Sequence, residues 1–271
     1  LMDPANETVQ MTRATLDRRG GKYSEAAQGL RRLIPKISKL TNRSIAWNQL
    51  GKCLEGQENW DEAFNAFSES NQLMKSDPSG SLPEPRGPHS LQTLARIQEW
   101  LRDNPMADWN KPATDETGGI AFLVGFPRSG TTLLDRMLRA HPDIEVVEEK
   151  SLFSSLHQDW SAPRTLEELA NLNDAQIADA RNIYRQEMSR HRRQPQRSLV
   201  IDKLPLNLVY LFLIRRLFPK APVIFLQRHP MDACISCYFQ AFEIEGSMAY
   251  FLDIEKTAQY YDAVMQVAVP S

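Results

Sequence analysis

The sequence predicts an α/β protein in which a parallel sheet has helices on both faces and follows a small all-helical module. Three observations support this fold class. Residues 1–76 are rich in helix-forming residues and poor in proline. From Ile120 onward, short continuous apolar runs alternate with amphipathic segments, which is typical of parallel strands covered on both faces. The first of these runs leads directly into a glycine-flanked loop.

Residues 1–76 contain two similar segments, 21–30 and 58–67, which align on an aromatic residue, a Glu-Ala pair and a large apolar residue. Around the second segment the sequence resembles the tetratricopeptide pattern W-x2-L-G…A-x3-F. The residues that match this pattern are Trp47, Leu50, Gly51, Ala63 and Phe67. We therefore expect tetratricopeptide-like helix pairs here, with an unrelated helical bundle as the alternative.

A stretch rich in proline and glycine separates this module from the rest of the chain. Residues 77–88 hold four prolines and two glycines, which break regular structure. The apolar spacing that follows predicts one helix at 89–102. The expected organisation is therefore a helical module at 1–76, a linker with one helix at 77–119, and an α/β domain at 120–271.

The α/β domain is expected to contain four strands, at 120–125, 144–147, 198–202 and 222–227. Its helices are expected at 130–140, 151–159, 174–192, 206–217, 230–241 and 249–266. In open parallel sheets, ligands bind beyond the carboxyl ends of the strands. We therefore expect the ligand-binding and catalytic residues directly after the last residues of these four strands.

Composition excludes several classes of function. The net charge of −2 over 271 residues gives no global reason to expect nucleic acid or anionic lipid as a partner. Three cysteines are too few for a secreted disulfide framework. The longest apolar run of the second half, 208–214, is too short to span a membrane, and no signal peptide opens the chain. We expect a cytoplasmic protein whose α/β domain is incomplete at the C-terminus.

The loop after the first strand has the outline of a phosphate loop. Residues 125–138 read GFPRSGTTLLDRML, whereas a P-loop NTPase would read G-x-x-x-x-G-K-[ST] here. Thr131 stands at the position of the missing lysine. A glycine turn that leads into a helix still offers backbone N–H groups and the positive helix end to an anion. The candidate phosphate ligands are Arg128, Ser129, Gly130, Thr131 and Thr132.

A second candidate anion site follows the fourth strand. Arg228 ends that strand, and Ser236 lies about two helical turns into the next expected helix. An arginine and a serine so placed could together hold a second phosphate, although an arginine at a strand end is often only a surface cation.

Together, G-x-P-R-S-G-T-T-L and R-x7-S resemble the sulfotransferases that use 3′-phosphoadenosine 5′-phosphosulfate (PAPS). In that family the first motif is the 5′-phosphosulfate loop and the second binds the 3′-phosphate. His141-Pro142-Asp143, followed by Glu148-Glu149, resembles the protein-tyrosine sulfotransferases, and Asp202-Lys203-Leu204-Pro205 resembles their K-x-P segment. With helical repeats in front, the chain also resembles bacterial tetratricopeptide-repeat-containing sulfotransferases. The resemblance covers about residues 120–262.

The resemblance implies transfer of the sulfuryl group from PAPS to an acceptor hydroxyl by in-line displacement. Adenosine 3′,5′-bisphosphate is then the product, and no metal ion is implied. Glu149 would be the general base, with Glu148 as its rival, while Lys203 and Arg128 would stabilise the developing charge. The acceptor could be a peptide tyrosine, a carbohydrate, or a small alcohol or phenol, and the helical module could bind a protein partner.

Two other functions stay open. The first is a P-loop kinase that uses ATP. The missing lysine and the lack of an obvious carboxylate at the end of a strand beside the loop argue against it. The second is a non-catalytic repeat scaffold.

Other patterns favour structural roles. Cys234-x2-Cys237 falls inside an expected helix and is unlike a zinc site. The basic run 181–197 is expected to be a solvated helix end, with the steering of an acidic acceptor as the alternative.

Overall fold

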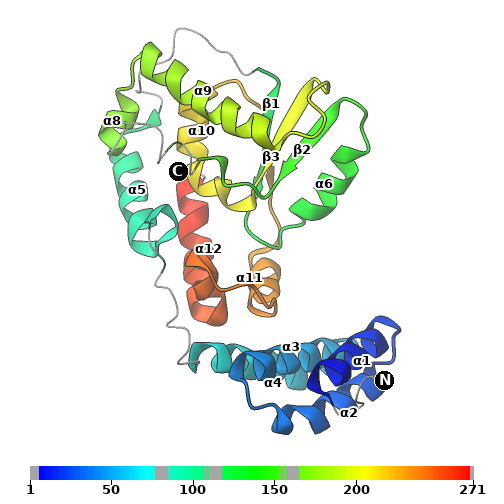
Figure 1. Ribbon diagram of the computed structural model, residues 1–271. Helices are drawn as coiled ribbons and strands as arrows, with labels where there is room; N and C mark the ends of the chain where they lie inside the picture. Colours follow the sequence, from blue (N-terminus) through cyan, green and yellow to red (C-terminus); the bar gives the residue numbers. More distant parts are fainter. Residues whose placement is uncertain are drawn as a thin grey trace. The chain divides into compact units, whose positions relative to one another are not determined.

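The computed structural model describes residues 6–76, 85, 87–106, 109, 118–153, 156 and 165–268 (Figure 1). Its contacts divide the chain into two compact units. The first comprises Leu1–Arg86 with Cys234–Ala258, and the second comprises Gly87–Ala233 with Gln259–Ser271. The domain boundaries expected from the sequence stay a prediction. Each unit is described by itself.

The first unit is built mainly from four helices, in which each packs against the next along the chain. They are α1 (Glu7–Arg19), α2 (Tyr23–Leu33), α3 (Leu40–Glu55) and α4 (Trp60–Ser76). Small residues allow close packing: a Cβ atom added at Gly51 of α3 would lie 2.8 Å from the ring of Phe67 of α4. Residues 6–76 are thus helical as expected, and their identity as tetratricopeptide repeats stays a prediction.

The same unit contains the segment that follows Cys234, which includes the end of α11 (Pro230–Tyr238). The buried Asn71 donates a hydrogen bond from Nδ2 to the carbonyl oxygen of Tyr238 at 2.9 Å, and Asn48 donates to that of Phe239 at 2.9 Å. The rings of Phe67 and Phe239 stack with centroids 4.1 Å apart. The face formed by α3 and α4 therefore binds a segment of its own chain.

The second unit contains a four-stranded parallel sheet in the order β2-β3-β1-β4. The strands are β1 (Ile120–Gly125), β2 (Ile144–Glu148), β3 (Leu199–Lys203) and β4 (Val223–Leu226). They match the expected strands to within a residue or two, and the expected parallel sheet is confirmed. β1 is central and fully buried, which explains its continuous apolar sequence.

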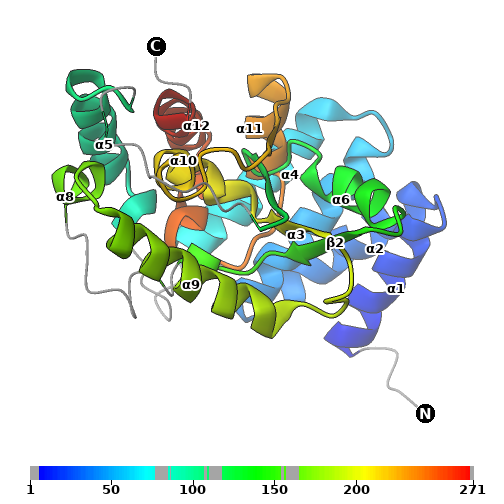
Figure 2. The same ribbon diagram turned by 90° about the horizontal axis from the view of Figure 1, so that it is seen from above.

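Helices cover both faces of this sheet, as predicted (Figures 1 and 2). α6 (Thr131–Arg139) packs Leu134 and Leu138 against the core of one face. On the other face, Tyr184 of α9 (Asp174–His191) packs near Phe122 of β1, with ring centroids 6.1 Å apart. Asn173 and Gln176 form a capping box that begins α9.

The remaining helices of this unit include α5 (Leu91–Asp103), α8 (Leu166–Ala170) and α10 (Leu211–Leu217). α12 (Ile254–Ala268) begins in the first unit and ends in the second. The expected helix at 89–102 corresponds to α5, and the helix expected at 151–159 lies largely outside the described residues.

Two helix predictions were wrong in detail. The expected helix at 206–217 starts as a 3₁₀ helix, Pro205–Tyr210, in which Asn207 turns inward to bond the Asp202 carboxylate. The expected helix at 249–266 is interrupted at Asp253, whose backbone is extended with φ −138°. The Asp253 side chain accepts the first free N–H groups of α12, so it caps a new helix rather than continuing one.

Candidate active site

The five candidate phosphate ligands follow β1 at the carboxyl edge of the sheet: Arg128, Ser129 and Gly130 lie in the loop, and Thr131 and Thr132 begin α6. Gly130 precedes α6 with φ +100°, a conformation that favours glycine. A Cβ atom at Gly125 would lie 2.5 Å from the carbonyl oxygen of Leu226 on β4, so that position also requires glycine. Ser129 and Thr131 are buried, whereas Arg128, Gly130 and Thr132 are exposed. The first N–H groups of α6 therefore belong to a short segment that also carries three hydroxyl side chains and an arginine.

Two candidate catalytic residues have unusual backbone conformations. Arg128 has φ +68° and Glu149 has φ +50°. Non-glycine residues in this region cost on the order of 1–3 kcal/mol and persist where the surroundings impose them. The Glu149 N–H donates to the carbonyl oxygen of Lys203 at 2.8 Å, which extends the ladder between β2 and β3.

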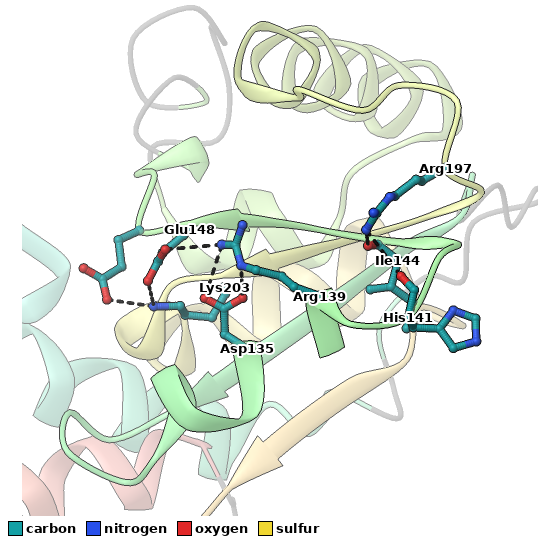
Figure 3. A network of polar contacts seen from close by, with 8 residues as sticks. Asp135, Arg139, His141, Ile144, Glu148, Arg197 and Lys203 are labelled. Atoms are coloured by element: carbon teal, nitrogen blue, oxygen red, sulfur yellow. Dashed lines mark hydrogen bonds and ion pairs between the residues drawn. The ribbon is translucent and has the colours of Figure 1, made fainter. Parts of the chain in front are cut away.

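Lys203, at the end of β3, joins the two adjacent glutamates (Figure 3). Its side chain is fully buried, and Nζ donates to Glu149 Oε1 at 2.8 Å and to Glu148 Oε1 at 3.0 Å. Glu148 and Glu149 are 45% and 57% exposed. The structure thus brings together the predicted base, its rival and the predicted charge-stabilising lysine.

Arg139 and Asp135 of α6 extend this set of charges and were not singled out from the sequence. Arg139 Nη2 donates to Glu148 Oε2 at 3.2 Å, and Arg139 also binds the buried Asp135 carboxylate through two hydrogen bonds (Figure 3). The hydrogen bond from Lys203, together with the charges of Lys203 and Arg139, lowers the pKa of Glu148 below its ordinary value. The four-residue spacing of Asp135 and Arg139 on an expected helix could have indicated their pairing.

Arg228 contacts the loop between β1 and α6 directly. Its Nη1 donates to the carbonyl oxygen of Arg128 at 3.2 Å, and its Nε lies 3.7 Å from Asp232 Oδ2. The two arginines predicted to bind phosphates therefore lie together. Ser236 is half-buried in the part of α11 that belongs to the first unit, and its pairing with Arg228 stays a prediction.

Asp202 corrects one expectation. A carboxylate does lie on the strand beside the loop strand, because β3 pairs with β1. Its side chain is fully buried on the opposite face of β3 from Lys203, and Oδ2 accepts from Tyr184 Oη at 2.8 Å and Asn207 Nδ2 at 3.0 Å. Burial raises the pKa of Asp202 to about 7, against the effect of these two hydrogen bonds.

The basic run 181–197 begins within α9 and is only partly the solvated helix end expected, because Arg181 is buried. Arg181 donates to the carbonyl oxygen of Leu217, Arg192 binds Glu145 at 2.8 Å, and Arg197 donates to the carbonyl oxygen of Ile144. These bonds fasten α10 and β2, so the contacts favour the structural interpretation of the run over the steering of an acidic acceptor.

The two cysteines of the Cys-x2-Cys pair lie in buried surroundings. Cys234 and Cys237 are buried cysteines that are not joined in a disulfide. Within the described ranges, no group of three or more His, Cys, Asp or Glu side chains could hold a metal ion.

Comparisons with known proteins indicate a family. A family model described as "Sulfotransferase family" matches residues 121–269. Protein-tyrosine sulfotransferase 1 of Rattus norvegicus is 32% identical over 165 residues, which cover 52% of this chain and 43% of the relative. Nodulation protein NoeE of Sinorhizobium fredii (strain NBRC 101917 / NGR234) is 32% identical over 121 residues, which cover 41% of this chain and 29% of the relative.

A longer similarity covers most of the chain. An uncharacterized protein of Aquifex aeolicus (strain VF5) is 26% identical over 230 residues, which cover 81% of this chain and 29% of the relative. The chain spans less than half the length of each of these three relatives. No solved structure matches it. In the part of the chain that the structure describes, no helix has the length and apolar character needed to cross a membrane.

Proposed function

Because the chain belongs to the sulfotransferase family, we propose that it transfers the sulfuryl group of PAPS to an acceptor hydroxyl. One observation carries this proposal. The buried Lys203 ammonium and the Glu149 carboxylate are 2.8 Å apart at the same sheet edge as the loop that begins α6. A general base and a cation that stabilises charge are the two groups that such a transfer needs beside an anion-binding loop.

The loop suits the 5′-phosphosulfate end of PAPS. This end carries one phosphate, capped by the sulfuryl group, so no pair of β- and γ-phosphates has to be neutralised by a P-loop lysine. Thr131 at the lysine position is consistent with such a ligand. We assign the 5′ side to residues 128–132. Arg228, which bonds to the loop, and Ser236 are assigned to the 3′-phosphate.

The reaction proposed is an in-line displacement at sulfur. The acceptor oxygen forms a new bond to sulfur while the bond from sulfur to the 5′-phosphate oxygen breaks, and that oxygen keeps the electron pair. Glu149 takes the proton of the acceptor hydroxyl as general base. Lys203 and Arg128 stabilise the negative charge that develops on the sulfuryl and leaving oxygens.

The acceptor belongs to one of three classes: a peptide tyrosine, a carbohydrate, or a small alcohol or phenol. The name of the rat relative favours tyrosine as the first to be assayed. We further propose a cytoplasmic location and a tetratricopeptide-like module. Because α3 and α4 bind residues 238 and 239 of the chain itself, a protein partner of this module would use another face.

A P-loop kinase is the second candidate, and the surroundings of Asp202 weigh against it. A kinase needs an ionised carboxylate near the loop for Mg²⁺. Asp202 is fully buried, its pKa is raised to about 7, and its Oδ2 is engaged by Tyr184 and Asn207.

Ligand-induced stabilisation separates these two functions. At about 100 times its Kd, adenosine 3′,5′-bisphosphate should add about 2.7 kcal/mol of stability. At about 2–4 °C per kcal/mol, the melting temperature should rise by roughly 5–10 °C. We expect this rise with EDTA present and only a weak effect of ATP with Mg²⁺, as measured by differential scanning fluorimetry. Equal shifts from the two nucleotides would contradict sulfuryl transfer from PAPS.

Arg228→Ala should weaken adenosine 3′,5′-bisphosphate by about 10–150-fold, because a charge-assisted hydrogen bond is worth about 1.5–3 kcal/mol. The affinity for 5′-AMP should fall far less, through the lost bond to the Arg128 carbonyl oxygen alone. Isothermal titration with both nucleotides measures the difference. Arg136→Ala, at an exposed arginine of α6 outside the loop, is the matched control and should change neither affinity. Equal losses for both nucleotides in Arg228→Ala would remove Arg228 from the 3′-phosphate site.

A further inference from the structure

Lys203 is a buried cation that depends on its two carboxylate partners. Its side chain is 0% exposed, and Nζ lies 3.0 Å from Glu148 Oε1 and 2.8 Å from Glu149 Oε1. A buried ammonium without a counter-ion is strongly destabilised and tends to lose its proton. If Glu149 accepts the proton of the acceptor, it loses its negative charge at the stage at which the lysine charge is needed.

The two glutamates are held differently. Glu148 is bound from both sides, because Oε1 accepts from Lys203 and Oε2 accepts from Arg139 Nη2 at 3.2 Å. Both cations lower the pKa of Glu148. Within the described residues, Lys203 is the one hydrogen-bond partner of the Glu149 carboxylate, which is 57% exposed. Glu148 is therefore the carboxylate built to stay charged, and Glu149 is the one free to take up a proton.

The support for Glu148 comes from the helix that begins at the phosphate loop. Arg139 Nε binds Asp135 Oδ1 at 2.5 Å and Nη2 binds Asp135 Oδ2 at 3.2 Å, and Asp135 is only 1% exposed (Figure 3). The charged groups around Glu148 and Lys203 are thus Asp135 and Arg139 from α6 and Glu149 after β2. Glu145, also on β2, adds a longer-range attraction for Arg139.

We propose that Glu148, braced by Arg139 and Asp135, is a positioning residue that keeps Lys203 charged and in place while Glu149 takes the acceptor proton, an inference that rests on the proposed sulfuryl transfer. Glu148 then remains as the counter-ion of Lys203 after Glu149 is neutralised. The third N–H bond of the ammonium is then the one left for the sulfuryl group.

The test is the pH dependence of turnover in Glu148→Gln, which keeps an oxygen acceptor for Lys203 but removes the charge. We expect kcat to fall about tenfold with the acceptor KM unchanged, well below the roughly 100-fold cost of misplacing a reacting group by about 1 Å. Both limbs of the pH–rate profile should move to lower pH. The direction follows from charge alone, because the substitution removes one negative charge from a cluster in which Glu148 and Glu149 share Lys203.

Two further variants sharpen the test. Glu145→Gln is the matched control, because Glu145 is an arginine-paired glutamate on the same strand that bonds to Arg192 instead of Arg139. It should leave the pH–rate profile in place even if it lowers the melting temperature. Arg139→Gln should reproduce the effect of Glu148→Gln in part, and Arg139→Lys, which restores the charge, should recover most of the lost turnover.

The outcomes are separable. An unmoved profile in Glu148→Gln, or a loss of kcat as large as that of Glu149→Gln, would overturn the positioning role. If the wild-type protein transfers no sulfuryl group to any acceptor, the proposed function fails, and melting temperatures then test the hold on Lys203. If the decreases in melting temperature caused by Glu148→Gln and by Lys203→Met do not add in the double variant, the result supports a direct interaction that keeps Lys203 in place. Additive decreases in melting temperature would overturn the positioning of Lys203 by Glu148.

Discussion

Glu149→Gln should lower turnover on the order of 10²–10⁴-fold, the contribution typical of general base catalysis, while adenosine 3′,5′-bisphosphate binds as before. Glutamine has almost the same shape and keeps an oxygen for Lys203, but it cannot take a proton. Glu149 is 57% exposed at the end of β2, so the substitution leaves the core intact. Single-turnover assays with labelled PAPS and titration of the bisphosphate measure the two quantities.

The comparison with Glu148→Gln makes this prediction specific. Glu148 neighbours Glu149 in the chain, shares Lys203 as a partner and is 45% exposed, so the two variants remove the same charge from nearly the same place. We expect a loss of only about tenfold in Glu148→Gln, or about 1.4 kcal/mol in activation free energy. The reverse ranking of the two variants would assign the proton transfer to Glu148.

The second large effect is a dependence of stability on pH that comes from Asp202. Burial raises the pKa of this carboxyl from 3.8 to about 7 in the folded protein. Between these values the folded state binds more protons than the unfolded state, so stability falls as pH rises. The stability that protonated Asp202 contributes is fully present below its pKa in the unfolded chain. It is lost as pH rises through its pKa in the folded protein. Between pH 5 and pH 8 the loss should be about 2–3 kcal/mol.

Asp202→Asn should remove this dependence, because asparagine keeps the shape and does not ionise. The measurement is the free energy of unfolding by urea at pH 5 and pH 8, and the wild type should lose about 2–3 kcal/mol relative to the variant. Tyr184→Phe should enlarge the loss, since the Tyr184 hydroxyl lowers the pKa of Asp202. A difference between wild type and Asp202→Asn that stays the same at both pH values would show that Asp202 does not titrate in this range.

Local pattern was enough to predict the framework of this protein. Continuous apolar runs placed β1, β2, β3 and β4 because a strand covered on both faces has few polar residues. The glycine loop could also be predicted from the sequence, since Gly125 and Gly130 meet local steric requirements. Two helix predictions failed where a single side-chain hydrogen bond outweighed the apolar pattern. Asp253 caps a new helix, and Asn207 turns inward to bond Asp202.

The sequence by itself thus determined the strands, the loop and the residue types at the strand ends, because periodicity and glycine geometry are short-range properties. Only the tertiary structure decided which charges meet. Lys203 reaches Glu148 and Glu149 because β3 pairs with β2 in parallel register, and Arg139 braces Glu148 because α6 lies over that same face. Asp202 and Lys203 are neighbours in the chain, yet the alternation of a strand sends one into the core and the other to the site. Such pairings depend on strand order and helix packing, which join residues far apart in the chain and leave no local trace.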